Sequence, residues 1–223
     1  MKKITFAALF ACAVCFGFGC DSGTNQQDSV DMAEDANEAR IDSMDTSAMN
    51  DTTDLDDQAE FMVKAASGGM MEVALGNMAA NQATNPEVKS FAKMMVTDHT
   101  KANEELKTLA ASKNVTLPTR MGEDHQKHVD KMADLRGADF DREYMSMMVE
   151  DHEEDVEDFR EASQENEYDA EVKAFAGKTL TTLEKHLQQA KQIRDKLSGS
   201  TTSSSTTTDR TTTTTPTSET PKR

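Results

Sequence analysis

The chain has 223 residues and a formal net charge of −17, with 41 Asp and Glu residues against 24 Lys and Arg residues. This balance argues against nucleic acid as a partner, because phosphate recognition requires a basic face. All three cysteines fall within the first twenty residues, so the rest of the chain can form no internal disulfide and its fold must rest on burial.

Residues 1–19 (MKKITFAALFACAVCFGFG) predict a signal peptide. Two lysines precede an apolar stretch of small residues that is too short for a stable membrane helix. The small residue before Cys20 is typical of bacterial lipoprotein signals, in which the cysteine becomes lipidated, although Gly17 replaces the usual Leu-like side chain. We therefore expect lipidation at Cys20, with plain secretion as the alternative. The expected location is the cell envelope, lipid-anchored to a bacterial membrane on the outer-membrane or periplasmic side.

Residues 20–56 are expected to form a disordered acidic tether. Between positions 21 and 56, eleven Asp or Glu residues meet only Arg40, and apolar side chains are too few to offset the entropy of the chain. Residues 199–223 contain seventeen Ser or Thr residues and no apolar period. This composition predicts a second disordered segment that could carry O-glycans.

Residues 57–198 have helical apolar spacing throughout, and no stretch alternates like a strand. We expect the first helix over 57–83 and a second after Asn85-Pro86-Glu87, which supplies a cap, a first-turn proline and an early acid. The third helix follows the break at Gly137-Ala138-Asp139, and the fourth begins near Asp169. The connection between the second and third helices carries a short helix over about 125–135.

Two repeats indicate that this region is a duplicated helical hairpin. The run MMVTDH (94–99) returns as MMVEDH (147–152), and EVKSFA (87–92) returns as EVKAFA (171–176). Short loops within each pair and a long connection between the pairs predict an all-α fold, a ferritin-like four-helix bundle with a long crossover. Because the two copies would face each other, the last histidines of the MMVxDH runs should meet inside the bundle.

The same region resembles the DUF4142 family of bacterial envelope proteins. The resemblance is carried by AASGGMMEVALG (65–76), the two Met-Val-x-Asp-His runs, His125-Gln126 and GADFDREY (137–144), and it covers nearly all of residues 57–197. It implies a ferritin-like fold and an envelope location. It supplies no reaction and no site residues.

The interior of the bundle predicts no dinuclear carboxylate site. Di-iron proteins of this architecture use Glu-x-x-His pairs, whereas an aliphatic residue stands three before each of His99, His152 and His186. A softer site remains, because Met95 and Met148 each precede a histidine by four residues and share its helical face. Thioether and imidazole ligands suit copper, particularly Cu(I). The candidate metal ligands are Glu72, Met95, His99, Met148, His152 and His186.

The same pattern also has a purely structural interpretation. Methionines fill irregular helical cores, and the histidines could donate hydrogen bonds to carboxylates of neighbouring helices, with Asp98 and Asp151 turned toward water or a lysine. His125 and His128 are expected at the surface. Three functions therefore stay open: a non-catalytic binding or structural module of the envelope, for example in stress, with an unknown protein partner; a copper-type metal-binding protein; and a metal-dependent redox enzyme.

Overall fold

The computed structural model describes residues 27–44 and 53–203, and within these ranges it contains six α-helices and no strands. The all-α prediction is thereby confirmed. The five helices expected from the sequence all begin close to their predicted positions. The helices are α1 (Ser29–Asp42), α2 (Thr53–Gln82), α3 (Pro86–Lys113), α4 (Glu123–Ala133), α5 (Gly137–Gln164) and α6 (Ala170–Ser203).

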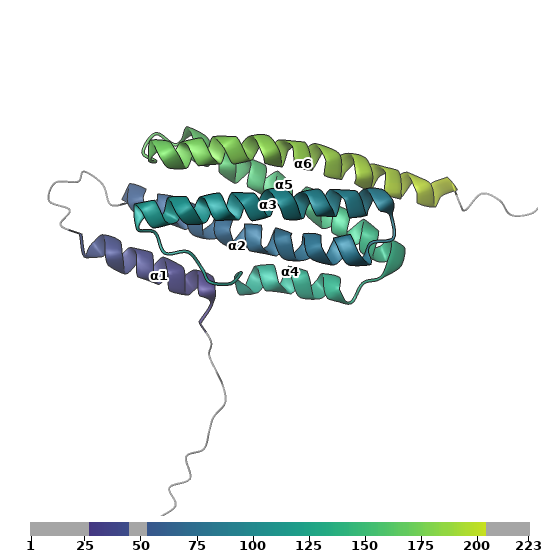
Figure 1. Ribbon diagram of the computed structural model, residues 1–223, viewed down its shortest axis with the longest axis horizontal. Helices are drawn as coiled ribbons and strands as arrows, with labels where there is room; N and C mark the ends of the chain where they lie inside the picture. The colour runs from purple at the N-terminus through teal and green to yellow at the C-terminus, as the bar shows by residue number, and fades with distance from the viewer. Residues whose placement is uncertain (1–26, 45–52, 204–223) are drawn as a thin grey trace, which may run out of the picture.

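The four long helices form two hairpins that lie against each other (Figure 1). Helix α2 packs along α3 and α5 packs along α6, while contacts between α3 and α6 and between α2 and α5 join the hairpins. Helix α4 packs on α2 and runs opposite to α3, so that α5 starts at the same end of the molecule as α3. This return along the outside is the long connection that the sequence predicted.

The turn between α2 and α3 is fixed from two sides. The Asn85 side chain accepts hydrogen bonds from backbone N–H groups of the first turn of α3, and Pro86 occupies the first helical position. From α5, the buried carboxylate of Asp141 accepts the backbone N–H of Thr84 at 2.9 Å and that of Asn85 at 2.8 Å. A side chain of the second hairpin thus holds the turn of the first.

Helix α1 corrects part of the prediction of a disordered tether over residues 20–56, of which residues 20–26 and 45–52 lie outside the described residues. Its Ala33 and Ile41 side chains are buried, and the helix packs on α2. The buried Asn37 amide donates to the carbonyl oxygen of Thr116 at 2.9 Å and accepts the Thr116 N–H at 2.7 Å. Composition misled the prediction because α1 is ordered by docking small side chains and one amide onto the rest of the protein, without an apolar core of its own.

A polar layer divides the apolar core into two clusters. One cluster includes Phe91, Met95, Tyr144 and Met148, and the other includes Met62, Leu106, Phe159 and Phe175. Between the clusters, each long helix contributes a buried carboxylate or imidazole, and these are Glu72 from α2, His99 from α3, His152 from α5 and His186 from α6. The candidate site therefore sits at mid-height, flanked by apolar packing on both sides.

The predicted signal peptide, Cys20 and residues 204–223 lie outside the described residues. Helix α6 continues to Ser203, past the end of the bundle expected at residue 198, so the predicted tail is helical at its start. Among the helices that the structure describes, none combines the length and the apolar character needed to cross a membrane.

Candidate metal centre

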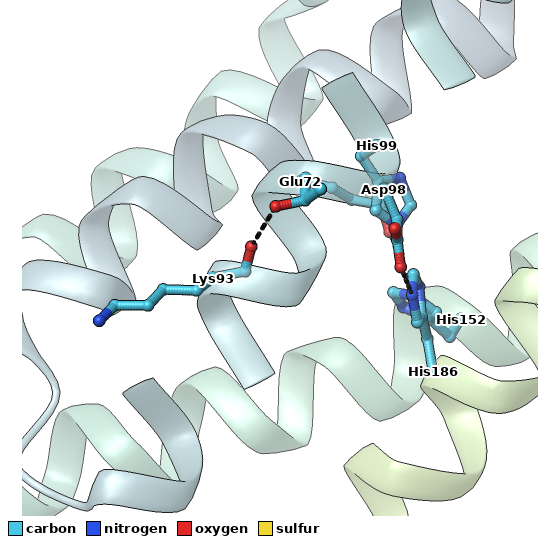
Figure 2. A network of polar contacts seen from close by, with 7 residues as sticks. Glu72, Lys93, Asp98, His99, His152 and His186 are labelled. Atoms are coloured by element: carbon cyan, nitrogen blue, oxygen red, sulfur yellow. Dashed lines mark hydrogen bonds and ion pairs between the residues drawn. The ribbon is translucent and has the colours of Figure 1, made fainter. Parts of the chain in front are cut away.

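Three imidazoles and one carboxylate converge in the polar layer. The ring centroids of His99 and His152 are 5.7 Å apart, those of His99 and His186 are 5.3 Å apart, and those of His152 and His186 are 5.5 Å apart. One ligand-type nitrogen from each ring lies within 4.8 Å of the other two. The expectation that His99 and His152 from the two hairpins meet inside the protein is confirmed, and His186 joins them (Figure 2).

The close approach of α2 and α3 brings Glu72 to this point. Glu72 lies on α2 between Gly69 and Gly76, which share its helical face. A Cβ atom on Gly76 would come within 2.9 Å of the Val96 side chain on α3, so only glycine permits this spacing of the helices. As a result, Glu72 Oε2 lies 2.5 Å from His99 Nδ1, with both side chains almost fully buried.

Two of the imidazoles are oriented by carboxylates. With Glu72 ionised, His99 Nδ1–H donates to it, which leaves the lone pair on His99 Nε2. Likewise, Asp98 Oδ2 lies 3.0 Å from His186 Nε2 and leaves the lone pair on His186 Nδ1. Both lone-pair nitrogens are buried without a hydrogen-bond partner. A carboxylate that holds the far nitrogen of a histidine is the arrangement found around metal-ligating imidazoles.

The third imidazole has no well-aligned hydrogen bond at either nitrogen, and its contact with the backbone of Met148 is weak. His152 is 0 % exposed, and both of its ring nitrogens are unpartnered. The nearest ion-pair contact runs from His152 Nε2 to Glu72 Oε1 at 3.4 Å, which is too poorly aligned to count as a hydrogen bond. Buried polar atoms are normally satisfied, so this ring calls for an unseen partner such as a metal ion.

Burial sets the protonation of the centre. It lowers the pKa of His152 to about 4, so this imidazole is neutral and able to act as a ligand near pH 7. Burial also lowers the pKa of His186, against the opposing effect of its bond with Asp98. For Glu72, burial acts to raise the pKa, but its close contact with His99 more than offsets this effect and holds the pKa below its ordinary value.

A second group of ligand-type atoms adjoins the first and shares His152. Atoms of Glu72, Asp151 and His152 lie within 4.8 Å of one another, and the Asp151 carboxyl group, when protonated, can donate a hydrogen bond to Glu72. Burial, reinforced by the negative charge of Glu72, raises the pKa of Asp151 and of Asp155, one helical turn further along α5. A bound cation would relieve this crowding of carboxylates.

The other candidate residues fall into two sets. Met95 and Met148 are fully buried and belong to the apolar cluster beside the polar layer, so their role as ligands stays a prediction. His128 is exposed, as expected. His125, in contrast, is partly buried and lies against Ser67, with Nδ1 and Oγ 2.6 Å apart, which corrects its assignment to the surface.

Sequence reasoning missed the two aspartates that precede the repeated histidines. Asp98 was expected to face water or a lysine but contacts His186, and Asp151 was expected to do the same but adjoins Glu72 and His152. The available signal was the repeat itself, since Asp-His closes both MMVxDH runs. A residue next to a core position lies about 100° around the helix, where a third helix can still reach it.

The comparisons with known proteins give a family and no activity. A family model described as "Domain of unknown function (DUF4142)" matches residues 43–193. This span includes all four residues of the polar layer together with both aspartates. No curated protein and no solved structure matches the chain.

Proposed function

The chain belongs to the DUF4142 family, a domain of unknown function, and from its buried centre we propose that it is a metal-binding protein holding one divalent first-row transition-metal ion. The observation that carries the proposal is the set of unpartnered nitrogens on three converging imidazoles, two of which are oriented by carboxylates. A purely structural polar network would pair these atoms with one another.

The ligands would be His99 Nε2, His186 Nδ1 and one nitrogen of His152, completed by an oxygen of Glu72 or Asp151. Imidazole with carboxylate suits zinc, copper, iron and nickel better than magnesium or calcium. By the usual affinity order for divalent ions, Cu²⁺ would bind most tightly. The soft copper(I) site predicted from thioethers is the alternative, and the burial of Met95 and Met148 beside the polar layer supports keeping it.

The small inner cavity of the site favours binding over turnover, since the larger hollows lined by Asp151 and by His186 lie outside it. The cavity that borders Glu72 and His99 has a volume of only about 20 Å³. Such a space accommodates roughly one water molecule or a small ion and no organic substrate. We therefore propose sequestration or delivery of the ion as the role, in place of catalysis on a larger molecule.

The ferritin-like fold and the location in the cell envelope are also proposals. The two joined hairpins and the return of α4 support a ferritin-like four-helix bundle with a crossover. The lysines and apolar run before Cys20 support export and a lipid anchor in the bacterial envelope. A Cys20→Ser variant that still partitions into detergent after export would contradict the anchor.

A cobalt titration of the metal-stripped full-length protein tests the proposed function. Visible absorption of bound Co²⁺ reports both stoichiometry and nitrogen–oxygen coordination, and competition with Zn²⁺ gives the affinity of the natural class of ion. We expect one equivalent, lost in His152→Leu and His186→Leu and retained in the matched surface variant His128→Ala. Binding that survives both core substitutions, or no binding by the parent protein, would refute the proposal.

The copper(I) alternative needs separate variants. Met95→Leu and Met148→Leu remove the thioethers while conserving core volume. Loss of Cu(I) binding in these two variants, with Co²⁺ binding intact, would favour the soft site. Unchanged Cu(I) binding would remove the methionines from the ligand set.

A further inference from the structure

Three hollows lie in series across the protein at the level of the metal centre. A cleft of about 380 Å³, here called the acidic cleft, lies between α2 and α5 beside the starts of α1 and α4. A recess of about 100 Å³ lies on the opposite side between α3 and α6. Between them is the inner cavity of about 20 Å³ at Glu72 and His99.

Shared walls connect each outer hollow with the inner cavity. Ala65 and Asp155 border both the acidic cleft and the inner cavity. His99 and Ala102 border both the α3–α6 recess and the inner cavity. Phe159 also borders both the acidic cleft and the inner cavity, and Thr179 and Leu183 also border both the recess and the inner cavity. Each outer hollow therefore shares a wall with the inner cavity, and each shared wall contains one alanine.

The two outer hollows differ in charge. Among the described residues that line the acidic cleft, seven are Asp or Glu, and the lysine at its rim, Lys64, is paired with Glu60 at 2.7 Å. The α3–α6 recess has two acids and two lysines, of which Lys178 and Glu105 are paired at 2.6 Å. A cleft with one sign of charge concentrates ions of the opposite sign and speeds their association.

The acidic cleft also ends on the ligand group itself. Asp151 lines the cleft and is one of the three residues whose ligand-type atoms lie within 4.8 Å of one another. Its partners in that group are Glu72, which is 2 % exposed with Oε1 unpartnered, and His152, which is 0 % exposed with both nitrogens unpartnered. A cation at Asp151 in the cleft would therefore lie beside Glu72 and His152. The α3–α6 recess, in turn, is lined by His99 and His186, so charge is what distinguishes the two hollows.

We infer, on the basis of the proposed function, that divalent cations load the centre through the acidic cleft, passing Ala65 and Asp155 to reach Asp151 and the histidines. Asp155 acts as the relay carboxylate, because it borders both the cleft and the inner cavity. The charge-balanced α3–α6 recess is not the loading route.

A matched pair of plugging variants tests the route. Ala65→Leu narrows the passage from the acidic cleft, and Ala102→Leu narrows the passage from the recess. Both alanines are partly buried residues on long helices, so the packing disturbance is similar. Stopped-flow mixing with Co²⁺ should show loading slowed about tenfold or more by Ala65→Leu and changed less than about twofold by Ala102→Leu. The reverse order, or equal rates, would overturn the inference.

A second pair of variants separates the local role of Asp155 in ion transfer from a general effect of removing acidic side chains. Asp155→Asn replaces the carboxyl group that borders both the cleft and the inner cavity, and Glu105→Gln replaces a carboxylate of the recess. Only Asp155→Asn should slow Co²⁺ loading, again by about tenfold, because it alone alters the carboxyl group between the cleft and the inner cavity. Equal slowing in both variants would refute the relay.

Equilibrium stoichiometry, measured after long incubation, distinguishes a failure of the proposed metal binding from a failure of the proposed loading route. A parent protein that binds no Co²⁺ defeats the proposed function and the route with it. A parent protein that binds one equivalent at rates insensitive to Ala65 and Asp155 defeats the route alone.

Discussion

Replacing His152 by leucine should stabilise the metal-free protein. His152 is fully buried, neutral near pH 7 because burial lowers its pKa to about 4, and without a well-aligned hydrogen bond at either nitrogen apart from a weak contact with the backbone of Met148. Leucine has a similar volume and no polar atom to satisfy. A residue kept for ligand binding is expected to cost stability in the absence of its ligand.

The magnitude follows from the two unpartnered nitrogens. Each buried polar atom left unsatisfied costs roughly 1–3 kcal/mol, and the contact of Nε2 with Glu72 at 3.4 Å recovers part of one. We therefore expect His152→Leu to raise the free energy of unfolding by about 2 kcal/mol. For a chain of this size, that corresponds to an increase in Tm of roughly 4–8 °C.

Thermal unfolding with and without metal is the assay. In chelator, the leucine variant should melt above the parent protein. With free Zn²⁺ at a hundred times its Kd, the parent should gain about 2.7 kcal/mol and the variant nothing, so the gap should close or reverse. Met145→Leu, two turns earlier on α5, is the matched core control and should change stability by less than about 1.5 kcal/mol with or without metal.

The opposite result would refute the reasoning. If His152→Leu lowers the Tm of the metal-free protein, the ring has a stabilising partner in the apo state, and the polar layer is a structural network. If metal raises the Tm of both proteins equally, the ion binds elsewhere.

Three further predictions concern contacts that hold the helices around the site. Asp141→Ala should lower the free energy of unfolding by about 3 kcal/mol or more in urea titrations, since the turn between α2 and α3 loses its buried charged acceptor; a loss under 1 kcal/mol would contradict this. Gly76→Ala should destabilise by about 1–3 kcal/mol through its clash with Val96, despite the better helix propensity of alanine, and a more stable variant would show that the helices can separate freely. Asp28 caps α1 and accepts the Glu123 N–H, which is the main reason that its pKa is lowered. Its contribution is complete above the ordinary pKa of Asp and is lost as pH falls through the lowered folded value. The protection factors of the α1 amides, which correct for intrinsic exchange, should therefore fall in acid in the parent protein and should already be low at neutral pH in Asp28→Ala.

The sequence by itself determined the helices and their pairing. Apolar spacing and the signals at Asn85-Pro86 and Gly137 located the long helices, because caps and turn residues act locally. The duplicated MMVxDH run placed His99 and His152 at equivalent points of two copies, and their meeting follows from the symmetry of the hairpins. Local chemistry and repetition were sufficient for these features.

Only the tertiary structure decided how the centre is completed. A helical period gives the face on which a residue lies, but the rotation and height of one helix against another depend on packing. For that reason the pairing of Glu72 with His99, the contact of Asp98 with His186 and the inward position of Asp151 became visible only in three dimensions. The docking of α1 and the acidic cleft beside it likewise arise from segments distant in the chain, whose contacts no local pattern encodes.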